Sequence, residues 1–432
     1  MLVPHPGPLV DLENFHKFGK KISECERQAV TRGSLNGNSA GFYGVERMQA
    51  GTTALAHGGL PLVPIILWMD KQEANGTDRT LLVFNCHEPW VYQLDALDYK
   101  LDIIVDLRGK YNKGWDYQMR PLPARARLIS LREALQSPAE YYCIIAHNTT
   151  DLLDVRSRPE PRLIVLHHTL EGRIQEEHSS IDPDKMKEML HTYLELVGGH
   201  AVATSMFKGE SWGFTDDIVH FGIDADDYPP YSGHEAAGLR ICNFISSRRQ
   251  ILLWDFHERA FEGLPVTLVG HNPDMPGVEA ARDWNHLKQM LQAHRFYIHT
   301  ADPRFEAGYN MATAEAMAAG LPVIGNRHPT SPVKHGVSGF LSDNPRELRR
   351  FAQILLEDRG LAGMMGQQAR KTVLERFSLV RFRHAFLRSI EIARRKWRTR
   401  KVDPSSFTID DLRCTDFRCE SQARDQIVNR KW

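Results

Sequence analysis

The sequence lacks an excess of charge, a cysteine framework and long apolar runs. Lys and Arg together number 54, as do Asp and Glu, so no global field favours nucleic acid as a partner. The six cysteines include no CxxC pair, which favours reduced thiols in a cytoplasmic protein over disulfides. The longest apolar run, 60–69, is interrupted by prolines, whereas a membrane-spanning helix needs roughly twenty apolar residues. With no secretory signal pattern either, we expect a soluble or, at most, membrane-peripheral protein.

Common motifs for nucleotides and metals are also missing. No strand-like run is followed by GxGxxG, and no GxxxxGK[ST] occurs, which weighs against a nicotinamide dehydrogenase and a P-loop enzyme. The CHEPWV stretch has Val91 where HExxH requires its second histidine, so this motif predicts no zinc site. These motifs therefore predict neither a cofactor nor a metal site.

What is present is a regular alternation of short apolar runs with helical segments. Continuous apolar strands separated by helices indicate parallel sheets covered on both faces, hence an α/β fold of two doubly wound, Rossmann-like domains facing across a cleft. The strands expected in the first domain are 80–85, 101–107, 127–131, 141–148, 162–168, 201–205 and 217–223. Those expected in the second are 239–245, 264–270, 294–300 and 322–326.

Length and composition place the boundaries of these domains, because 432 residues exceed one ordinary domain. The polar, Pro/Gly-rich stretch 224–238 is predicted to be the linker. The expected units are an N-terminal extension (1–78), an N-terminal domain (79–225), a C-terminal domain (226–380), a helix (381–397) and a poorly ordered tail (398–432).

The helix predicted at 381–397 has an apolar stripe opposite a basic face. At helical spacing the stripe comprises Phe382, Phe386, Ile390, Ala393 and Trp397. Docking of this stripe against a domain is the simpler interpretation. The alternative is that the basic face meets a membrane surface or another anionic partner.

The stretch RFEAGYNMATAEAMAAGLPVIG carries the strongest functional signal. It follows a predicted strand and begins a helix that ends at Gly320, so residues 308–311 lie at a helix N-terminus, where backbone N–H groups and the helix dipole favour a diphosphate. Glu315, about one turn into the helix, suits sugar or ribose hydroxyls. An anion that also carries hydroxyls is a nucleotide sugar. The competing interpretation is an ordinary strand–helix corner with an exposed Glu306.

Histidines follow three of the predicted strands of the first domain. Carboxyl ends of parallel strands share one sheet edge, so these side chains should face one cleft, although a lone histidine there is more often structural. The residues concerned are His87, His147, His167 and His168.

The order Glu–(spacer)–GluAlaMet–Ala–Gly–x–Pro–Val–Ile, followed by HPTSPVKHGVSGFL and ERFS, resembles the C-terminal domain of retaining group 1 glycosyltransferases of the two-domain GT-B architecture. The resemblance implies that Glu315 grips the nucleotide ribose. It also implies that Gly308, Tyr309, Asn310 and Met311 cradle the donor phosphate and sugar.

The chain departs from the family pattern at two points. The first motif glutamate should fall on Ala307, and Glu306 is the candidate to replace it. The basic pair expected after the first strand of the donor domain is represented by Arg248 and Arg249, whose guanidinium groups suit a diphosphate.

Further candidates follow from the same resemblance. His271 and Asn272 occupy the loop expected to contact the nucleotide. His168 corresponds to the family's histidine near the transferred sugar, and His87 is the next acceptor-side candidate.

The resemblance implies metal-independent transfer of a sugar from a nucleotide-diphosphate donor to a hydroxyl of a glycan, lipid-linked or small-molecule acceptor. The departing phosphate itself would deprotonate that hydroxyl, so no separate base is required. Two alternatives remain open. One is a related enzyme such as a sugar-nucleotide epimerase or phosphorylase. The other is a non-catalytic nucleotide-sugar-binding protein.

Overall fold

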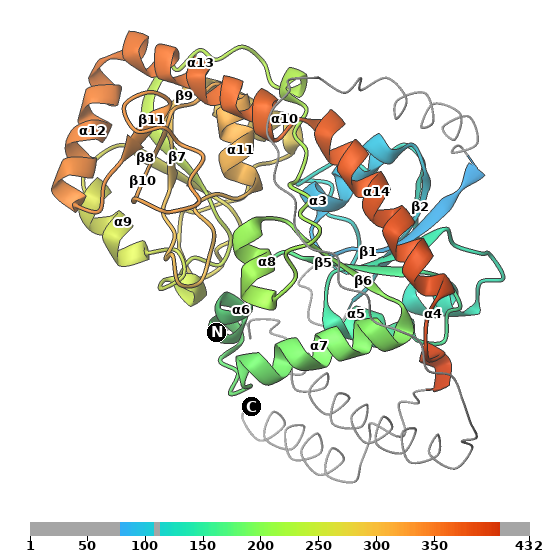
Figure 1. The fold of residues 1–432 in the computed structure, drawn as a ribbon. Coiled ribbons are helices and arrows are strands. Elements are labelled where there is room, and N and C mark those ends of the chain that lie inside the picture. Colours follow the sequence, from blue (N-terminus) through green and yellow to red (C-terminus); the bar gives the residue numbers. More distant parts are fainter. Residues whose placement is uncertain (1–77, 108–112, 407–432) are drawn as a thin grey trace, which may run out of the picture.

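The structure, a computed structural model, describes residues 78–107 and 113–406. Two parallel sheets with covering helices form two domains (Figure 1). The expected N-terminal extension, except for its last residue, and the part of the expected tail beyond residue 406 lie outside the described residues.

The N-terminal domain contains a six-stranded sheet of order β3-β2-β1-β4-β5-β6, in which every paired neighbour is parallel. Its central strands are buried along almost their whole length, as strands covered by helices on both faces must be. The strands are β1 (Thr80–Phe84), β2 (Lys100–Val105), β3 (Ala126–Ser130), β4 (Cys143–Ala146), β5 (Arg162–Leu166) and β6 (His200–Ala203). The helices are α3 (Glu88–Tyr92), η2 (Gln93–Leu97), α4 (Leu131–Gln136), α5 (Thr149–Asp154), α6 (Leu170–Glu177), α7 (Pro183–Val197) and α8 (Met206–Trp212).

The prediction of a seventh strand in this domain, at 217–223, is wrong. The segment makes only isolated bridges, from Ile218 to Ala203 and from Ile223 to Ser378. Its backbone meets β6 only at one bridge, where the Val219 N–H donates to the Ala203 carbonyl and the Asp217 carbonyl accepts from the Ala203 N–H. Beyond this bridge the N–H of Gly222 donates to a glutamine side chain, so the segment does not continue the ladder of the sheet despite the strand propensity of its apolar run.

The C-terminal domain contains a five-stranded parallel sheet of order β11-β10-β9-β7-β8. Its first strand begins at Glu235, inside the stretch predicted to be the linker. The strands are β7 (Glu235–Ile241), β8 (Val266–Val269), β9 (His294–His299), β10 (Val323–Gly325) and β11 (Gly339–Leu341). Between and beyond them lie η3 (Ala225–Asp227), η4 (Ser246–Arg248), α9 (Trp254–Phe261), α10 (Trp284–Ala293), α11 (Met311–Ala318), α12 (Pro345–Glu357) and α13 (Arg359–Arg376).

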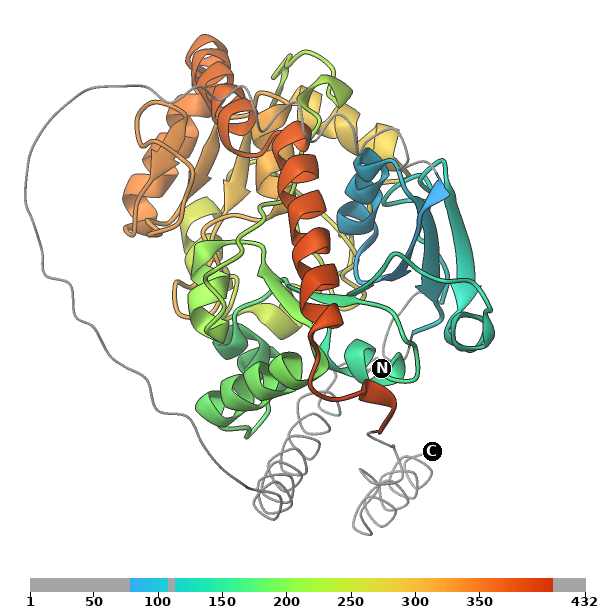
Figure 2. The ribbon, with the colours of Figure 1, turned by 45° about the vertical axis from the view of Figure 1, so that its right-hand side comes forward.

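Helix α14 (Leu379–Arg398) returns the chain to the N-terminal domain. It lies along that domain in both ribbon views (Figures 1 and 2) and contacts β4, β5 and β6. All five residues of its apolar stripe are buried, so the predicted docking is confirmed. Part of its basic face is also engaged within the chain: Arg388 pairs with Asp217, and Arg394 lies over the ring of Tyr142. The chain closes with η5 (Pro404–Ser406).

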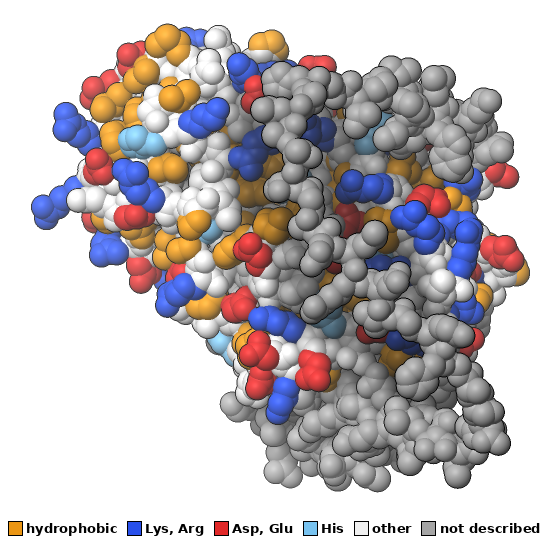
Figure 3. Space-filling model, in the orientation of Figure 1, with side chains coloured by type: hydrophobic (Ala, Val, Ile, Leu, Met, Phe, Trp, Pro, Cys, Tyr) orange, Lys and Arg blue, Asp and Glu red, His pale blue; other side chains and the backbone are white. Residues whose placement is uncertain are grey.

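Charge on the surface is mixed. On the face shown in Figure 3, Lys and Arg side chains are interspersed with Asp and Glu side chains over both domains. Within the described residues, no helix is both long enough and apolar enough to cross a membrane.

Candidate active site

The candidate site lies where the two domains meet. The loop after β9 carries Glu306 towards the N-terminal domain, and the loop after β5 carries His168 towards it in return. Ligands of open α/β sheets bind outside the carboxyl ends of parallel strands, and both loops follow such ends. Further contacts join the domains around this point: the pairs Thr169 and Phe305, Gln175 and Gln250, and His220 and Tyr309.

Glu306 is the centre of a charged cluster contributed by both domains. Its Oε1 lies 3.5 Å from Nζ of Lys208, on α8, and its Oε2 lies 3.8 Å from Nδ1 of His168. The Glu306 and Lys208 side chains are each 12% exposed, whereas that of His168 is 49% exposed. The sequence analysis identified Glu306 and His168 but missed Lys208. A basic residue shortly after the predicted strand 201–205 was the available signal.

The Glu306 carboxylate is strongly favoured in its charged form. Burial alone would raise its pKa, but Lys208, His168 and the N–H of Ala307 outweigh burial and lower the pKa to about 2. The Ala307 N–H donates to Oε1 at 2.8 Å. A permanently ionised, hydrogen-bond-accepting carboxylate can hold sugar hydroxyls or a developing positive charge, but it cannot donate a proton near neutral pH.

The two candidate arginines have different surroundings. Arg248 is mostly buried, lies 3.3 Å from the Glu176 carboxylate and contributes to lowering the pKa of Glu306. Arg249 is half-exposed, and Asp255 and Glu258 hold its guanidinium at the outer surface of α9. The structure therefore brings Arg248, but not Arg249, to the Glu306 cluster.

The N-terminus of α11 is built as the sequence predicts. The Asn310 side chain caps the helix by accepting from the Thr313 N–H at 2.8 Å, while Met311 begins the first turn, where N–H groups lack intrahelical partners. At Gly308, an added Cβ would lie 2.7 Å from the His328 ring, and its N–H already donates to Thr330. Side chains therefore engage the amides of Gly308, Asn310 and Thr313, whereas those of Met311 and the residue after it, in the first turn, could meet an anion.

Glu315 has an unexpected partner. Its carboxylate forms an ion pair with Arg120, which reaches across from the N-terminal domain, and both side chains are almost fully buried. The guanidinium stacks 3.5 Å from the centre of the Trp284 ring, at the start of α10. Burial raises the pKa of Glu315, and the Arg120 charge opposes that rise. Sequence reasoning missed this pair because Arg120 lies in an irregular segment without a motif.

The remaining candidates lie outside the cluster. Both ends of the Asn272 amide are bonded to backbone: its oxygen accepts from Ile245, and its nitrogen donates to Cys242. This residue therefore shapes the loop after β7. The His271 ring packs edge-on against Phe244. His87 is exposed at the end of β1.

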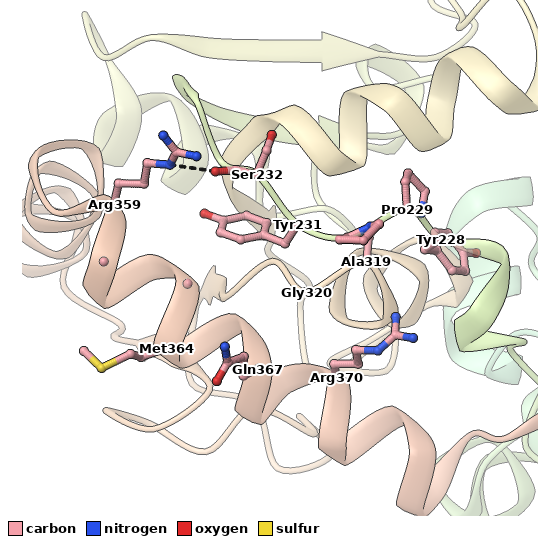
Figure 4. Close-up of a pocket in the computed structure, with 13 residues that line it drawn as sticks. Tyr228, Pro229, Tyr231, Ser232, Ala319, Gly320, Arg359, Met364, Gln367 and Arg370 are labelled. Carbon is pink, nitrogen blue, oxygen red and sulfur yellow. Dashed lines mark hydrogen bonds between the residues drawn. The ribbon is translucent and has the colours of Figure 1, made fainter.

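A separate hollow of about 740 Å³ lies between the linker and α13 (Figure 4). Tyr231 and Ser232 line one side and Gln367 and Arg370 another. None of the predicted site residues lines it, so it is distinct from the Glu306 cluster.

Two Rossmann-like domains, each built on a parallel sheet, define the GT-B architecture. A family model described as Glycosyl transferases group 1 matches residues 264–358, which span β8 to the end of α12. No curated protein matches the sequence.

Solved structures share the architecture over most of the chain. Anabaena HepE, in complex with UDP and glucose, is 16% identical with a TM-score of 0.52, over 72% of this chain and 99% of that one. Sucrose-phosphate synthase from Thermosynechococcus elongatus is 12% identical with a TM-score of 0.51, over 74% of this chain and all of that one. The match to S. aureus TarM, at 14% identity and a TM-score of 0.45, covers 57% of this chain and 54% of that one, so the chain spans about half of TarM. The likeness to HepE and sucrose-phosphate synthase, at these identities, shows the fold alone.

Proposed function

We propose that this protein transfers a sugar from a nucleotide-diphosphate sugar to an acceptor hydroxyl, with retention of anomeric configuration. The observation that carries the proposal is the cluster of Glu306, Lys208, His168 and Arg248 between the domains. The group 1 match and the GT-B fold shared with HepE, a protein solved with UDP and glucose, support the same reaction class.

Each charged residue has a defined role in this reaction. The bond between the sugar and the diphosphate breaks, and the leaving diphosphate gains negative charge that Lys208 and Arg248 stabilise. Glu306 accepts hydrogen bonds from the sugar, and His168 orients it from the acceptor side. The departing phosphate takes the proton of the acceptor hydroxyl as the new glycosidic bond forms on the same face. With Lys208 and Arg248 supplying positive charge at the diphosphate, we expect this step to proceed without Mg²⁺ or Mn²⁺.

The remaining expectations form part of the same proposal. The acceptor is a glycan, a lipid-linked sugar or a small molecule, and the protein acts in the cytoplasm. The exposed basic residues of α14, Arg381 and Arg395 among them, supply a peripheral contact with anionic membranes. Co-sedimentation with phosphatidylserine vesicles tests this contact, and an Arg381→Gln/Arg395→Gln variant that sediments like wild type would contradict it.

A second candidate function is nucleotide-sugar binding without transfer. The observation that favours it is the ion pair between Glu315 and Arg120, because this pair engages the carboxylate expected to hold the ribose. In this case donors bind but no acceptor is glycosylated.

The test begins with the full chain and a panel of UDP-, GDP- and ADP-sugars. A donor present at one hundred times its Kd should stabilise the protein by about 2.7 kcal/mol and raise its melting temperature. Lys208→Met should weaken donor binding about tenfold or more, because a hydrogen bond to a charged group contributes about 1.5–3 kcal/mol. The exposed Lys185→Met is the matched control.

Turnover is then measured with an acceptor library by mass spectrometry, without added Mg²⁺ or Mn²⁺, and the anomeric proton of the product is assigned by NMR. Binding without any turnover would favour the second candidate. If no nucleotide sugar raises the melting temperature, or if Lys208→Met binds donors like wild type, the proposed site is wrong.

A further inference from the structure

Three potential metal ligands converge in the N-terminal domain, outside the Glu306 cluster. The sulfur of Cys86 and one ring nitrogen each of His147 and His167 lie within 4.8 Å of one another. Nε2 of His167 is 3.8 Å from the Cys86 sulfur and 2.8 Å from Nδ1 of His147. One side-chain atom of each residue therefore points to a common centre.

The order of the strands in the hydrogen-bonded sheet produces this convergence. Strands β1, β4 and β5 are hydrogen-bonded neighbours, and the three residues follow their carboxyl ends by one or two positions. The backbone is fixed as well, since the His147 N–H donates to the Asp151 carboxylate at 2.8 Å. Ligands on the ends of adjacent strands are held more firmly than ligands on long loops.

The spacing is near that of a tetrahedral zinc centre. With Zn–S near 2.3 Å and Zn–N near 2.0–2.1 Å, ligand atoms are separated by roughly 3.3–3.6 Å. The observed 3.8 Å and 2.8 Å lie on either side of this range, and all three ligand atoms lie within 4.8 Å of one another, so the side chains would have to rotate to reach zinc geometry. Coordination would replace the short contact between the two imidazoles.

The surroundings suit a metal that is bound by neutral imidazole. The Trp90 ring packs edge-on against both imidazoles, with centroids 4.7 Å from His147 and 5.0 Å from His167. Both rings therefore lie against an apolar wall, a setting in which neutral imidazole coordinates metals.

We propose that Cys86, His147 and His167 bind a Zn²⁺ ion. The Cys86 thiol loses its proton to solvent as the sulfur–zinc bond forms, and both imidazoles coordinate without charge change. Three protein ligands leave a fourth position for water, the arrangement of zinc sites that remain open. The neighbouring His168 faces Glu306 instead, so the zinc site lies beside the proposed donor site and does not depend on the proposed function.

The test measures zinc and cobalt binding to the full chain. Protein from zinc-supplemented cultures should retain about one zinc per chain after gel filtration, by plasma mass spectrometry. After removal of zinc with a chelator, Co²⁺ should restore a thiolate-to-cobalt charge-transfer band in the near ultraviolet together with the visible bands of tetrahedral cobalt. Zinc should also raise the melting temperature of the stripped protein.

Variants assign the ligands. Cys86→Ser should abolish the charge-transfer band, and His147→Ala and His167→Ala should each weaken zinc binding at least about tenfold. Matched controls are Cys242→Ser, in the other domain, and His384→Ala, exposed on α14; both should bind zinc like wild type.

Further comparisons keep the result decisive. A Cys414→Ser/Cys419→Ser variant, changed outside the described residues, should keep full binding. If Cys86→Ser fails to fold, the Cys414→Ser/Cys419→Ser variant decides whether the proposed site binds zinc, by its cobalt charge-transfer band and by the rise of its melting temperature with zinc. A wild-type protein without zinc or a cobalt–thiolate band, or a Cys86→Ser variant with unchanged zinc content, would overturn the proposal.

Discussion

The ion pair between Arg120 and Glu315 supports a quantitative prediction about the coupling of the two domains. Each partner comes from a different domain, and the side chains are only 4% and 5% exposed. Removing one partner of a buried pair leaves the other charge without compensation, which costs about 3–5 kcal/mol. We therefore expect Arg120→Met to destabilise the protein by this amount, lowering the melting temperature by roughly 6–20 °C at about 2–4 °C per kcal/mol.

The double variant separates the pair from its surroundings. Replacing both charges by methionine leaves no buried charge, and such replacements are often neutral or stabilising. Arg120→Met/Glu315→Met should therefore be much more stable than the sum of the single variants predicts. A coupling energy of roughly 2–3 kcal/mol is expected, at the upper end of measured cycles. The exposed pair of Lys401 and Glu195 is the control, and Glu195→Gln should leave the melting temperature unchanged.

Nucleotide binding provides a second readout of the same perturbation. If Glu315 holds the ribose, Arg120 competes for that carboxylate, and Arg120→Met should bind UDP more tightly than wild type. The assays are urea unfolding of the four proteins in the cycle and titration calorimetry with UDP. A coupling energy below about 0.5 kcal/mol, the level of independent sites, would refute the ion pair. Unchanged UDP affinity in Arg120→Met would refute the competition.

Three further predictions concern the domain contact, the charged cluster and the C-terminal helix. At Gly172 an added Cβ would lie 2.1 Å from the carbonyl oxygen of Phe305, in the other domain. Gly172→Ala should therefore push the two domains apart beside Glu306 and lower the transfer rate. The control Gly363→Ala, where the nearest atom to an added Cβ is 3.7 Å away, should leave the rate unchanged. The pKa of Glu306 falls from 4.5 to about 2 on folding. The ionised Glu306 side chain should therefore stabilise the folded protein by on the order of 3 kcal/mol relative to the Glu306→Gln variant. In acid unfolding, this difference in stability should be complete above about pH 4.5 and should be lost as the pH falls towards 2. Phe386 is fully buried, and Phe386→Ala should cost about 3–5 kcal/mol in urea unfolding.

Local patterns were sufficient to predict much of the fold. Ten of the predicted strands lie where the structure has β1 to β10, because buried parallel strands appear in sequence as short apolar runs. The three-residue β11 was missed because so short a run carries no recognisable period. The error at 217–223 has a different origin, since that apolar run meets β6 at one isolated bridge and then bonds to a side chain instead of continuing the ladder.

The site could be predicted only in part, because some of its contacts join residues that are far apart in the sequence. The strand–helix motif predicted the N-terminus of α11, and the family resemblance singled out Glu306, because those features are local. The pairing of Arg120 with Glu315 joins residues 195 positions apart, and the contact of Lys208 with Glu306 depends on how two domains meet. No spacing rule within one sequence encodes either contact.

The displacement of the first motif glutamate, from 307 to 306, has a physical explanation in the structure. Ala307 is 1% exposed and belongs to an apolar cluster that also contains Tyr309. A glutamate at 307 would have to ionise within that cluster, at a large desolvation cost. The carboxylate at 306 instead meets Lys208 and His168 and stays charged. In this loop, therefore, position 306 is the one at which an ionised carboxylate can face the other domain, and the offset preserves the chemistry that the proposed reaction needs.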